Sequence, residues 1–126
     1  MPARTPEQID QLFAEALNAG DVDALVELYE PNASMRPSPD KTVTGTAAIR
    51  EALTGFIAAG PRMTLTARTV AQSGDVALVT AQWQLSMTGP DGKPAQMSGQ
   101  SVEVVRRQAG GDWLFVIDEP FGVAAK

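Results

Sequence analysis

The hydrophobic pattern of this chain changes its period near the middle, and that change restricts the fold more than any other feature. Up to residue 57, apolar side chains recur three and four residues apart, as on one face of an α-helix. From residue 63 to residue 118, segments rich in Thr and Val are separated by short turns containing Gly, Asp and Pro, which is typical of strands. Three helices followed by turn-linked strands predict an α+β fold, with helices covering one face of an antiparallel sheet.

The three predicted helices are separated by recognisable end signals. Thr5-Pro6-Glu7-Gln8 has the form of a capping box at the start of the first helix. Asp21 is expected to cap a second helix that extends through Tyr29. A short extended piece and a polar loop follow, and Thr46 is expected to cap the third helix.

Four strands are predicted after the third helix, at residues 63–71, 76–87, 96–107 and 113–118, and they form an antiparallel meander. Parts of these strands are apolar without alternating, so both faces of the sheet are expected to be covered. A second copy of the chain is the favoured explanation, and a C-terminal tail that folds back is the alternative. The sequence has no repeat and no linker, so residues 1–126 are predicted to form one domain.

The composition excludes several classes of function. The chain has 126 residues and contains neither Cys nor His, which rules out disulfides, Cys/His zinc sites, haem ligation by those residues and catalytic triads that need His. No metal-ligand spacing or phosphate-binding glycine motif is present, so no metal and no cofactor are predicted. The net charge of -5 disfavours nucleic acid and anionic membranes as partners. Without a signal peptide or a membrane-spanning apolar run, a cytoplasmic protein is expected.

In the absence of His and Cys, proton transfer must use carboxylates, Tyr29 or lysine. Most acids, Asp10 among them, fall at helix starts, on polar helix faces or in turns, and are expected to be solvated. Glu103 lies inside a Val-rich strand instead. It either points outward, where it can pair with Arg68 or Arg106, or points into a pocket between the sheet and the helices.

Asp118 and Glu119 follow the apolar run of the last predicted strand. Successive strand residues face opposite sides, so both cannot point inward unless the strand breaks at Pro120. Asp118 is either an ordinary surface acid or a pocket carboxylate whose pKa is raised by burial. Asp118 and Glu103 are therefore the candidate catalytic residues.

Five more residues are candidates for contacting a ligand. Arg36 either anchors an anionic group of the ligand or pairs with a surface acid. Trp83 lies in the middle of a predicted strand and is either a core residue or a platform for the ligand. Aromatic residues of the helices complete the set, namely Phe13, Tyr29 and Phe56.

Two motifs and the closing meander resemble a known family. Leu17-Asn18-Ala19-Gly20-Asp21 joins the first two predicted helices, and Gly45-Thr46-Ala47-Ala48-Ile49-Arg50-Glu51 opens the third. With these motifs the chain is similar to ketosteroid isomerase and to SnoaL-like polyketide cyclases of the nuclear transport factor 2-like superfamily. The resemblance implies a strongly curved antiparallel sheet wrapped around the three helices into a cone. It also implies an apolar interior for a small hydrophobic molecule and a homodimer formed through the sheet.

The resemblance does not extend to most catalytic residues of ketosteroid isomerase. The tyrosine that helps to hold the enolate oxygen in that enzyme corresponds to Phe13, which has no hydroxyl. The base aspartate precedes a proline in the strand after the second helix, and the matching stretch Met35-Arg36-Pro37 contains no acid. The second aspartic acid is matched only approximately by Glu103. This pattern argues against steroid isomerisation.

The sequence therefore predicts a protein that binds a small hydrophobic ligand. A carboxylate-assisted isomerase, cyclase or dehydratase step is the candidate activity, and this reaction class rests on the resemblance. The alternative is a non-catalytic accessory or protein-interaction domain whose pocket is filled by its own side chains.

Overall fold

The computed structural model describes residues 3–38, 40–89 and 91–122. Its elements are α1 (Gln8–Ala19), α2 (Val22–Val26), β1 (Tyr29–Ser38), β2 (Lys41–Thr44), α3 (Thr46–Ile57), β3 (Arg62–Ser73), β4 (Val76–Thr88), β5 (Pro94–Arg107) and β6 (Trp113–Glu119). The predicted α+β class is confirmed. The segment expected to be an extended piece and a loop forms the hairpin of β1 and β2.

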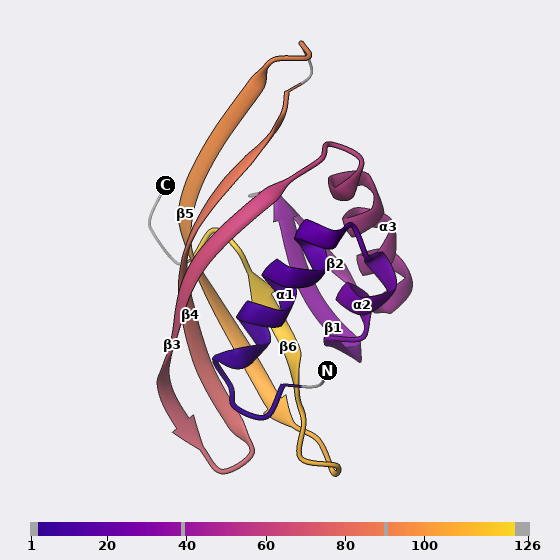
Figure 1. Cartoon of the computed structure of the whole chain (residues 1–126). Helices are drawn as coiled ribbons and strands as arrows, with labels where there is room; N and C mark the ends of the chain where they lie inside the picture. Colours follow the sequence, from indigo (N-terminus) through magenta and orange to yellow (C-terminus); the bar gives the residue numbers. More distant parts are fainter. Residues whose placement is uncertain (1–2, 39, 90, 123–126) are drawn as a thin grey trace.

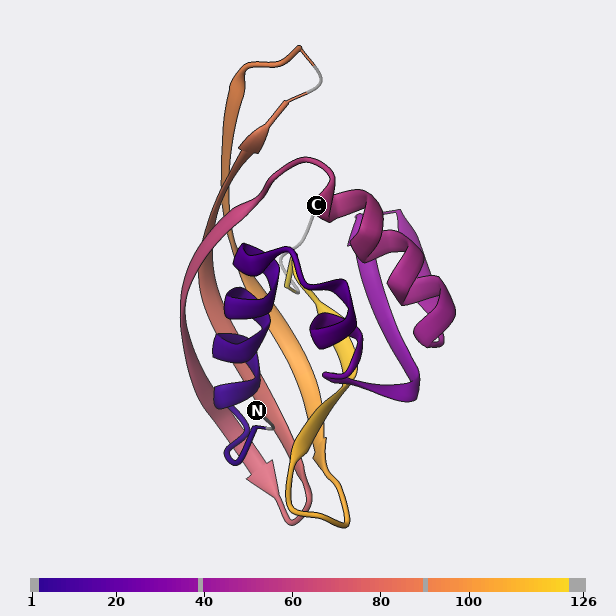
Figure 2. The same cartoon turned by 45° about the vertical axis from the view of Figure 1, so that its right-hand side comes forward.

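The six strands form one sheet in the order β2-β1-β6-β5-β4-β3. Neighbouring strands are antiparallel except β1 and β6, which run parallel. The sheet curves around the helices, with α1 on its concave side (Figure 1). The predicted curved sheet wrapped around three helices is confirmed, and the sheet is left unclosed, with β2 and β3 at its two edges. The far end of the β4–β5 hairpin extends beyond the helices, as the turned view also shows (Figure 2).

The predicted capping box of the first helix is wrong. α1 begins after Glu7, and no side chain caps it at that residue. Thr5 therefore precedes the helix without capping it, and Glu7 instead accepts a hydrogen bond from the Thr69 hydroxyl on β3. The predicted end of α1 is confirmed, because Gly20 takes the left-handed conformation with φ 69°.

The second and third helices also differ from the predictions at their ends. Asp21 caps α2 as predicted, but α2 ends at Val26, and Tyr29 begins β1 instead of closing a helix. α3 is preceded by Gly45, so Thr46 is its first residue and not its cap. The early end of α2 matters for function, since it places Tyr29 on the sheet.

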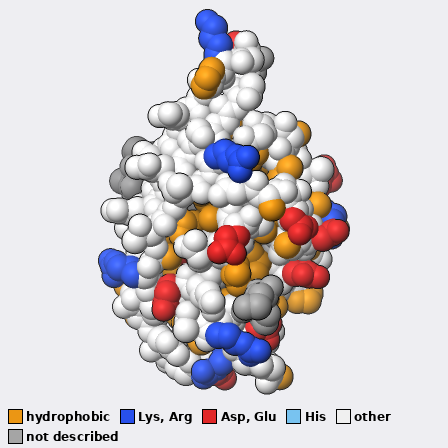
Figure 3. Space-filling model, viewed as in Figure 1, with side chains coloured by type: hydrophobic (Ala, Val, Ile, Leu, Met, Phe, Trp, Pro, Cys, Tyr) orange, Lys and Arg blue, Asp and Glu red, His pale blue; other side chains and the backbone are white. Residues whose placement is uncertain are grey.

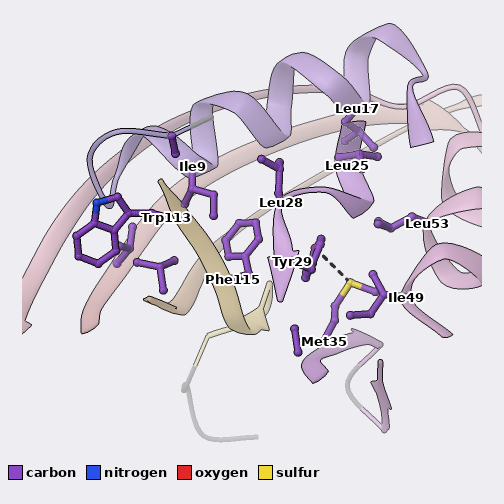
Figure 4. Close-up of a cluster of buried hydrophobic side chains, with 14 of the residues drawn as sticks. Ile9, Leu17, Leu25, Leu28, Tyr29, Met35, Ile49, Leu53, Trp113 and Phe115 are labelled. Carbon is purple, nitrogen blue, oxygen red and sulfur yellow. Dashed lines mark hydrogen bonds between the residues drawn. The ribbon is translucent and has the colours of Figure 1, made fainter. Parts of the chain in front are cut away.

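The hydrophobic core lies between the concave face of the sheet and the helices. Burying one large aliphatic or aromatic side chain stabilises the fold by about 1.5–3 kcal/mol. Figure 4 shows part of this core. Its largest fully buried side chains are Trp113, Phe115, Ile9, Leu17, Leu25, Ile49, Val79 and Val105.

The convex face of the sheet is also apolar in part. Leu78, Val104 and Ile117 lie opposite one another on β4, β5 and β6. Leu78 is 37% exposed and Ile117 is 47% exposed. The C-terminal tail, which was the alternative cover for this face, begins after residue 122 and lies outside the described residues. None of the helices in the described ranges is long and apolar enough to cross a membrane.

Candidate functional site

A cavity of about 380 Å³ lies between the helices and the concave face of the sheet. Its volume falls within the range of small-molecule sites, and most of its lining is apolar or aromatic. Three acids also line it, namely Asp10, Glu103 and Asp118, and no basic residue is among the described lining residues. On the face shown in Figure 3, hydrophobic side chains reach the surface in the middle of the molecule, with acidic side chains among them.

Glu103 points toward the helices, into this cavity. Alternate residues of β5 are buried at this point, and Glu103 follows that alternation with an exposed fraction of only 2%. Neither arginine proposed as a surface partner reaches it in the structure: Arg106 donates to Glu30 over 2.9 Å, and Arg68 is exposed on β3. Of the two orientations that the sequence left open, the inward one is observed.

Asp118 faces the same cavity because β6 contains an irregularity. Val104 pairs with Ile117 and Val105 pairs with Phe115, so one extra residue of β6, Val116, stands between the two pairs. Such a bulge reverses the alternation of side chains beyond it. Phe115 and Asp118 are therefore both buried on the cavity side, whereas Ile117 is exposed.

The register of the sheet then brings the two predicted catalytic acids together. Glu103 and Asp118 are directly opposite each other on β5 and β6. Side chains at opposite positions on one face have their Cβ atoms about 5 Å apart. The sequence singles out each acid separately. Their proximity depends on the pairing of β5 with β6, which no local sequence pattern specifies.

The Tyr29 hydroxyl donates a hydrogen bond to Asp118 Oδ2 over 2.6 Å. The tyrosine is held in place by Phe115, whose ring centroid lies 4.9 Å from its own, and by Met35, whose sulfur lies 3.7 Å from the hydroxyl (Figure 4). Burial raises the pKa of Asp118 to about 7, although the hydrogen bond from Tyr29 acts in the opposite direction. Burial also raises the pKa of Tyr29 well above its usual value, so the phenol stays protonated and remains a donor.

Asp10 was expected to be solvated, and that expectation is wrong. Its side chain is buried with an exposed fraction of 4%, and it lines the cavity from the first turn of α1. A signal for this was present in the sequence. Asp10, Ala14 and Leu17 follow the i, i+4, i+7 spacing of one helix face, and the other two are core residues.

Asp10 and Glu103 form a buried pair of acids. Apart from each other, Asp10 Oδ2 and Glu103 Oε1 find no hydrogen-bond partner in the part of the chain that the structure describes. Burial raises the pKa of Asp10 to about 6. Burial, and then the neighbouring Asp10, raise the pKa of Glu103 well above its usual value, and the protonated Glu103 donates to Asp10. The pair therefore holds a proton near neutral pH.

The aromatic candidates Phe13, Phe56 and Trp83 all line the cavity. Trp83 is both a core residue and part of the lining, so its two open interpretations are not exclusive. Its indole N–H donates to the Pro120 carbonyl over 2.8 Å. Its ring also lies so close to Gly99 that a Cβ there would be 2.6 Å from the indole. Glycine at this position therefore lets the ring lie against β5.

Arg36 and Tyr29 are not among the described residues that line the cavity. Arg36 donates from Nε to Glu119, and its guanidinium lies 5.7 Å from the centroid of the Phe121 ring. The pairing with an acid, one of the two alternatives for Arg36, is thus observed. Tyr29 reaches the site through Asp118.

No group of three or more His, Cys, Asp or Glu in residues 3–38, 40–89 and 91–122 is arranged so that it could hold a metal ion. The lining of the cavity offers carboxyl groups, the hydroxyl of Ser101 and aromatic rings as its functional side chains. Its chemistry is therefore that of proton transfer and of contact with apolar groups.

A curved sheet wrapped around helices is the fold that this chain shares with solved NTF2-like structures. The model of the SnoaL-like domain matches residues 9–116, and the chain belongs to this family. The resemblance found in the two sequence motifs is thereby confirmed. The prediction of a single domain over residues 1–126 stays a prediction.

Three solved structures illustrate the similarity of the fold. A candidate dehydratase of the NTF2-like family from Streptomyces avermitilis has a TM-score of 0.79 at 20% identity, with 94% of this chain and 93% of that chain covered. A ketosteroid isomerase-like protein from Erwinia carotovora atroseptica has a TM-score of 0.78 at 17% identity, with 88% of each chain covered. An NTF2-like protein with a cystatin-like fold from Novosphingobium aromaticivorans has a TM-score of 0.76 at 19% identity, with 95% and 80% covered. A comparison with curated proteins gives no significant match.

Proposed function

We propose that this protein binds a small hydrophobic molecule in the cavity and moves a proton on it with Asp118. The observation that carries the proposal is the burial of Asp118 in an apolar cavity, which raises its pKa to about 7. A carboxyl group with that pKa can accept and return a proton near neutral pH, as a general base and acid must.

The neighbouring groups suit an isomerase, cyclase or dehydratase step. The Tyr29 hydroxyl holds one oxygen of Asp118, which fixes the direction of the carboxyl group. In the free protein, Glu103, opposite Asp118, holds its proton toward Asp10 and so adds no charge beside Asp118. Proton transfer of this kind requires no cofactor, in keeping with the prediction that the protein uses none. The names of two structural neighbours, a candidate dehydratase and a ketosteroid isomerase-like protein, support the same reaction classes.

The competing function is a non-catalytic accessory domain with a filled pocket. A cavity of about 380 Å³ remains between the side chains, which argues against a pocket filled by them. Phe13, Phe56 and Trp83 then act as ligand-contacting residues, and Arg36 contributes by holding Glu119 beside Phe121 at the edge of the site.

We further propose that the protein is a homodimer formed through the convex face of the sheet. The support is a row of apolar side chains across three adjacent strands, formed by Leu78, Val104 and Ile117. Leu78 and Ile117 each expose more than a third of their surface. A cytoplasmic location stays a prediction from the sequence.

A thermal-shift screen with small hydrophobic ketones, polycyclic aromatics and steroids tests the proposed binding. A ligand at about 100 times its Kd stabilises the folded state by about 2.7 kcal/mol, which raises Tm by several degrees in a domain of this size. Binding that changes in Asp118→Asn but not in the exposed-acid control Asp23→Asn would support the assignment. Turnover of the bound compound, lost in Asp118→Asn, would establish catalysis. Absence of any hit would favour the accessory domain.

A further inference from the structure

The charge distribution of the cavity is one-sided. Asp10, Glu103 and Asp118 bring three carboxyl groups to a space that is otherwise mostly apolar. The described lining contains no basic side chain to balance them. A protein normally pairs or neutralises acids that it removes from water, and here a proton is the available neutralising group. The cavity is therefore better suited to a cationic ligand group than to an anionic one.

Two oxygen atoms in this group have little contact apart from the proton that the two acids share. Asp10 Oδ2 and Glu103 Oε1 find no other hydrogen-bond donor among the described residues, although the exposed fractions of the two residues are only 4% and 2%. Both residues line the cavity, one from α1 and the other from β5. A ligand that supplies N–H donors at this point would satisfy them.

Resting on the proposed function, we infer that the hydrophobic ligand of this cavity carries a basic nitrogen, which binds as an ammonium group to Asp10 and Glu103. The aromatic side chains of Phe13, Phe56 and Trp83 lie along the same cavity and suit an aryl or polycyclic body attached to that nitrogen. The net charge of -5 favours the approach of a cation.

The binding step exchanges one proton for one ammonium group. In the free protein, the Asp10–Glu103 pair holds a proton. The ligand enters with its nitrogen already protonated, and the proton of the pair leaves to solvent as both carboxylates become acceptors for the N–H donors. The affinity for the amine therefore rises with pH, as long as the amine itself stays protonated.

The other charged groups around the pair do not oppose this step. Asp118, facing from β6, is an acid that adds negative charge as it ionises near pH 7. Tyr29, facing from β1, stays a neutral donor to Asp118. Glu119 at the end of β6 is paired with Arg36 of β1. A ligand of the same shape that carries a hydroxyl or a carboxylate in place of the ammonium group should gain no affinity from these acids.

Three probes of one shape distinguish the charge preference from simple hydrophobic binding. Calorimetric titrations with 1-naphthylmethylamine, 1-naphthylmethanol and 1-naphthoate should give an affinity for the amine at least tenfold above that of the alcohol at pH 8, with the carboxylate weakest. Between pH 6 and pH 8, the Kd of the amine should fall several-fold while that of the alcohol changes less than twofold. Titrations in buffers of different ionisation enthalpy should detect a released proton with the amine alone.

The substitution Glu103→Gln tests the proposed partner of the ammonium group. The amide can donate to Asp10 as the protonated Glu103 does, so the variant mimics the state that cannot release a proton. The amine should lose at least tenfold in affinity at pH 8, and its pH dependence should flatten, whereas the alcohol should bind as before. Asp10→Asn is the second variant for the same measurement, and Asp23→Asn, an exposed acid, is the control that should change nothing.

The outcomes separate this inference from the proposed function. If the alcohol binds and the amine binds no more tightly, the ammonium inference is wrong while hydrophobic ligand binding stands. Stronger binding of the carboxylate would overturn it as well. If none of the three probes binds the wild type, both the inference and the proposed binding of compounds of this size fail. A preference for the amine that survives in both Glu103→Gln and Asp10→Asn would also overturn the assignment of the site.

Discussion

The hydroxyl of Tyr29 donates to Asp118 Oδ2 over 2.6 Å, and the contact joins residues that lie 89 positions apart in the chain. It depends on the parallel pairing of β1 and β6, which sets Tyr29 opposite Phe115 and Met35 opposite Asp118. Both groups are almost completely withdrawn from water. Little water competes for this hydrogen bond, so it has a direct effect on the pKa of Asp118.

Removing this hydroxyl should raise the pKa of Asp118 further. The hydrogen bond from Tyr29 favours the ionised carboxylate and opposes the effect of burial. In Tyr29→Phe, the pKa of Asp118 should move upward from about 7 by about one unit, the size expected of one hydrogen bond to a charged group. Carboxyl 13C NMR titration of the variant and the wild type measures the change. An unchanged pKa would show that the hydroxyl does not support the charged form.

The wild-type protein should be more stable at pH 5 than at pH 8. Asp10, Glu103 and Asp118 have pKa values in the folded state above those of an unfolded chain, where acids titrate near 4. The stabilisation that these three acids give the folded state is fully present below pH 4, and it is lost as the pH rises through their pKa values in the folded state. The pKa of Glu7 is lowered in the folded state, so Glu7 changes the stability only below about pH 4.5, the ordinary pKa of the group. It does not affect the comparison between pH 5 and pH 8.

Urea denaturation at pH 5, 6, 7 and 8 measures this dependence. The free energy of unfolding should fall by about 2 kcal/mol or more across the range, because each pKa unit corresponds to about 1.4 kcal/mol. A free energy that is constant or that increases with pH would contradict the raised pKa values.

Asp118→Asn should be more stable than the wild type at pH 8. The amide oxygen can still accept the hydrogen bond from Tyr29, and no charge has to be buried. The gain should be about 1 to 3 kcal/mol at pH 8 and smaller at pH 5, where less of the wild-type side chain is ionised. Chemical denaturation of both proteins measures it. The control Asp23→Asn, an exposed acid in a surface ion pair, should change stability by less than about 1 kcal/mol at either pH.

Much of the fold was predictable because its signals are local. The turn at Gly20, the cap at Asp21 and the four strands after residue 60 depend on neighbouring residues, and each is present in the structure. The sequence predicts β1 only as a short extended piece and β2 only as part of a loop, because the full length of β1 depends on its pairing with β6, at the other end of the chain. Tyr29 was assigned to a helix for the same reason.

The site was less predictable, because it is assembled by long-range geometry. Asp118 faces the cavity as a result of the bulge at Val116. The sequence does not show where a bulge occurs, so it does not determine to which face of the sheet Asp118 points. Asp10 is polar and near a helix start, which usually means exposure, but the curved sheet closes over that turn of α1. Glu103 meets Asp118 through the β5–β6 register, which no local pattern specifies.

Gly99→Ala should disturb the cavity wall through Trp83. The new methyl group would lie 2.6 Å from Cζ2 of the indole, so the ring must move and its hydrogen bond to the Pro120 carbonyl must weaken. We expect a loss of stability of about 1 to 3 kcal/mol, as for other overpacked sites, and weaker binding of 1-naphthylmethanol. Thermal unfolding and calorimetric titration measure the two effects. Ser98→Ala, at the exposed neighbouring position, is the matched control and should leave both unchanged.

Ile117→Lys should separate the proposed homodimer into monomers. Ile117 is 47% exposed and ends the apolar row formed with Leu78 and Val104, so a lysine there would bring a charge into the proposed sheet-to-sheet contact. Sedimentation equilibrium at micromolar concentration should give twice the chain mass for the wild type and the chain mass for the variant. Met97→Lys is the control, because Met97 is 45% exposed but lies on the cavity side of β5. A wild type that sediments as a monomer would remove the dimer, and the apolar row would then be an ordinary exposed surface.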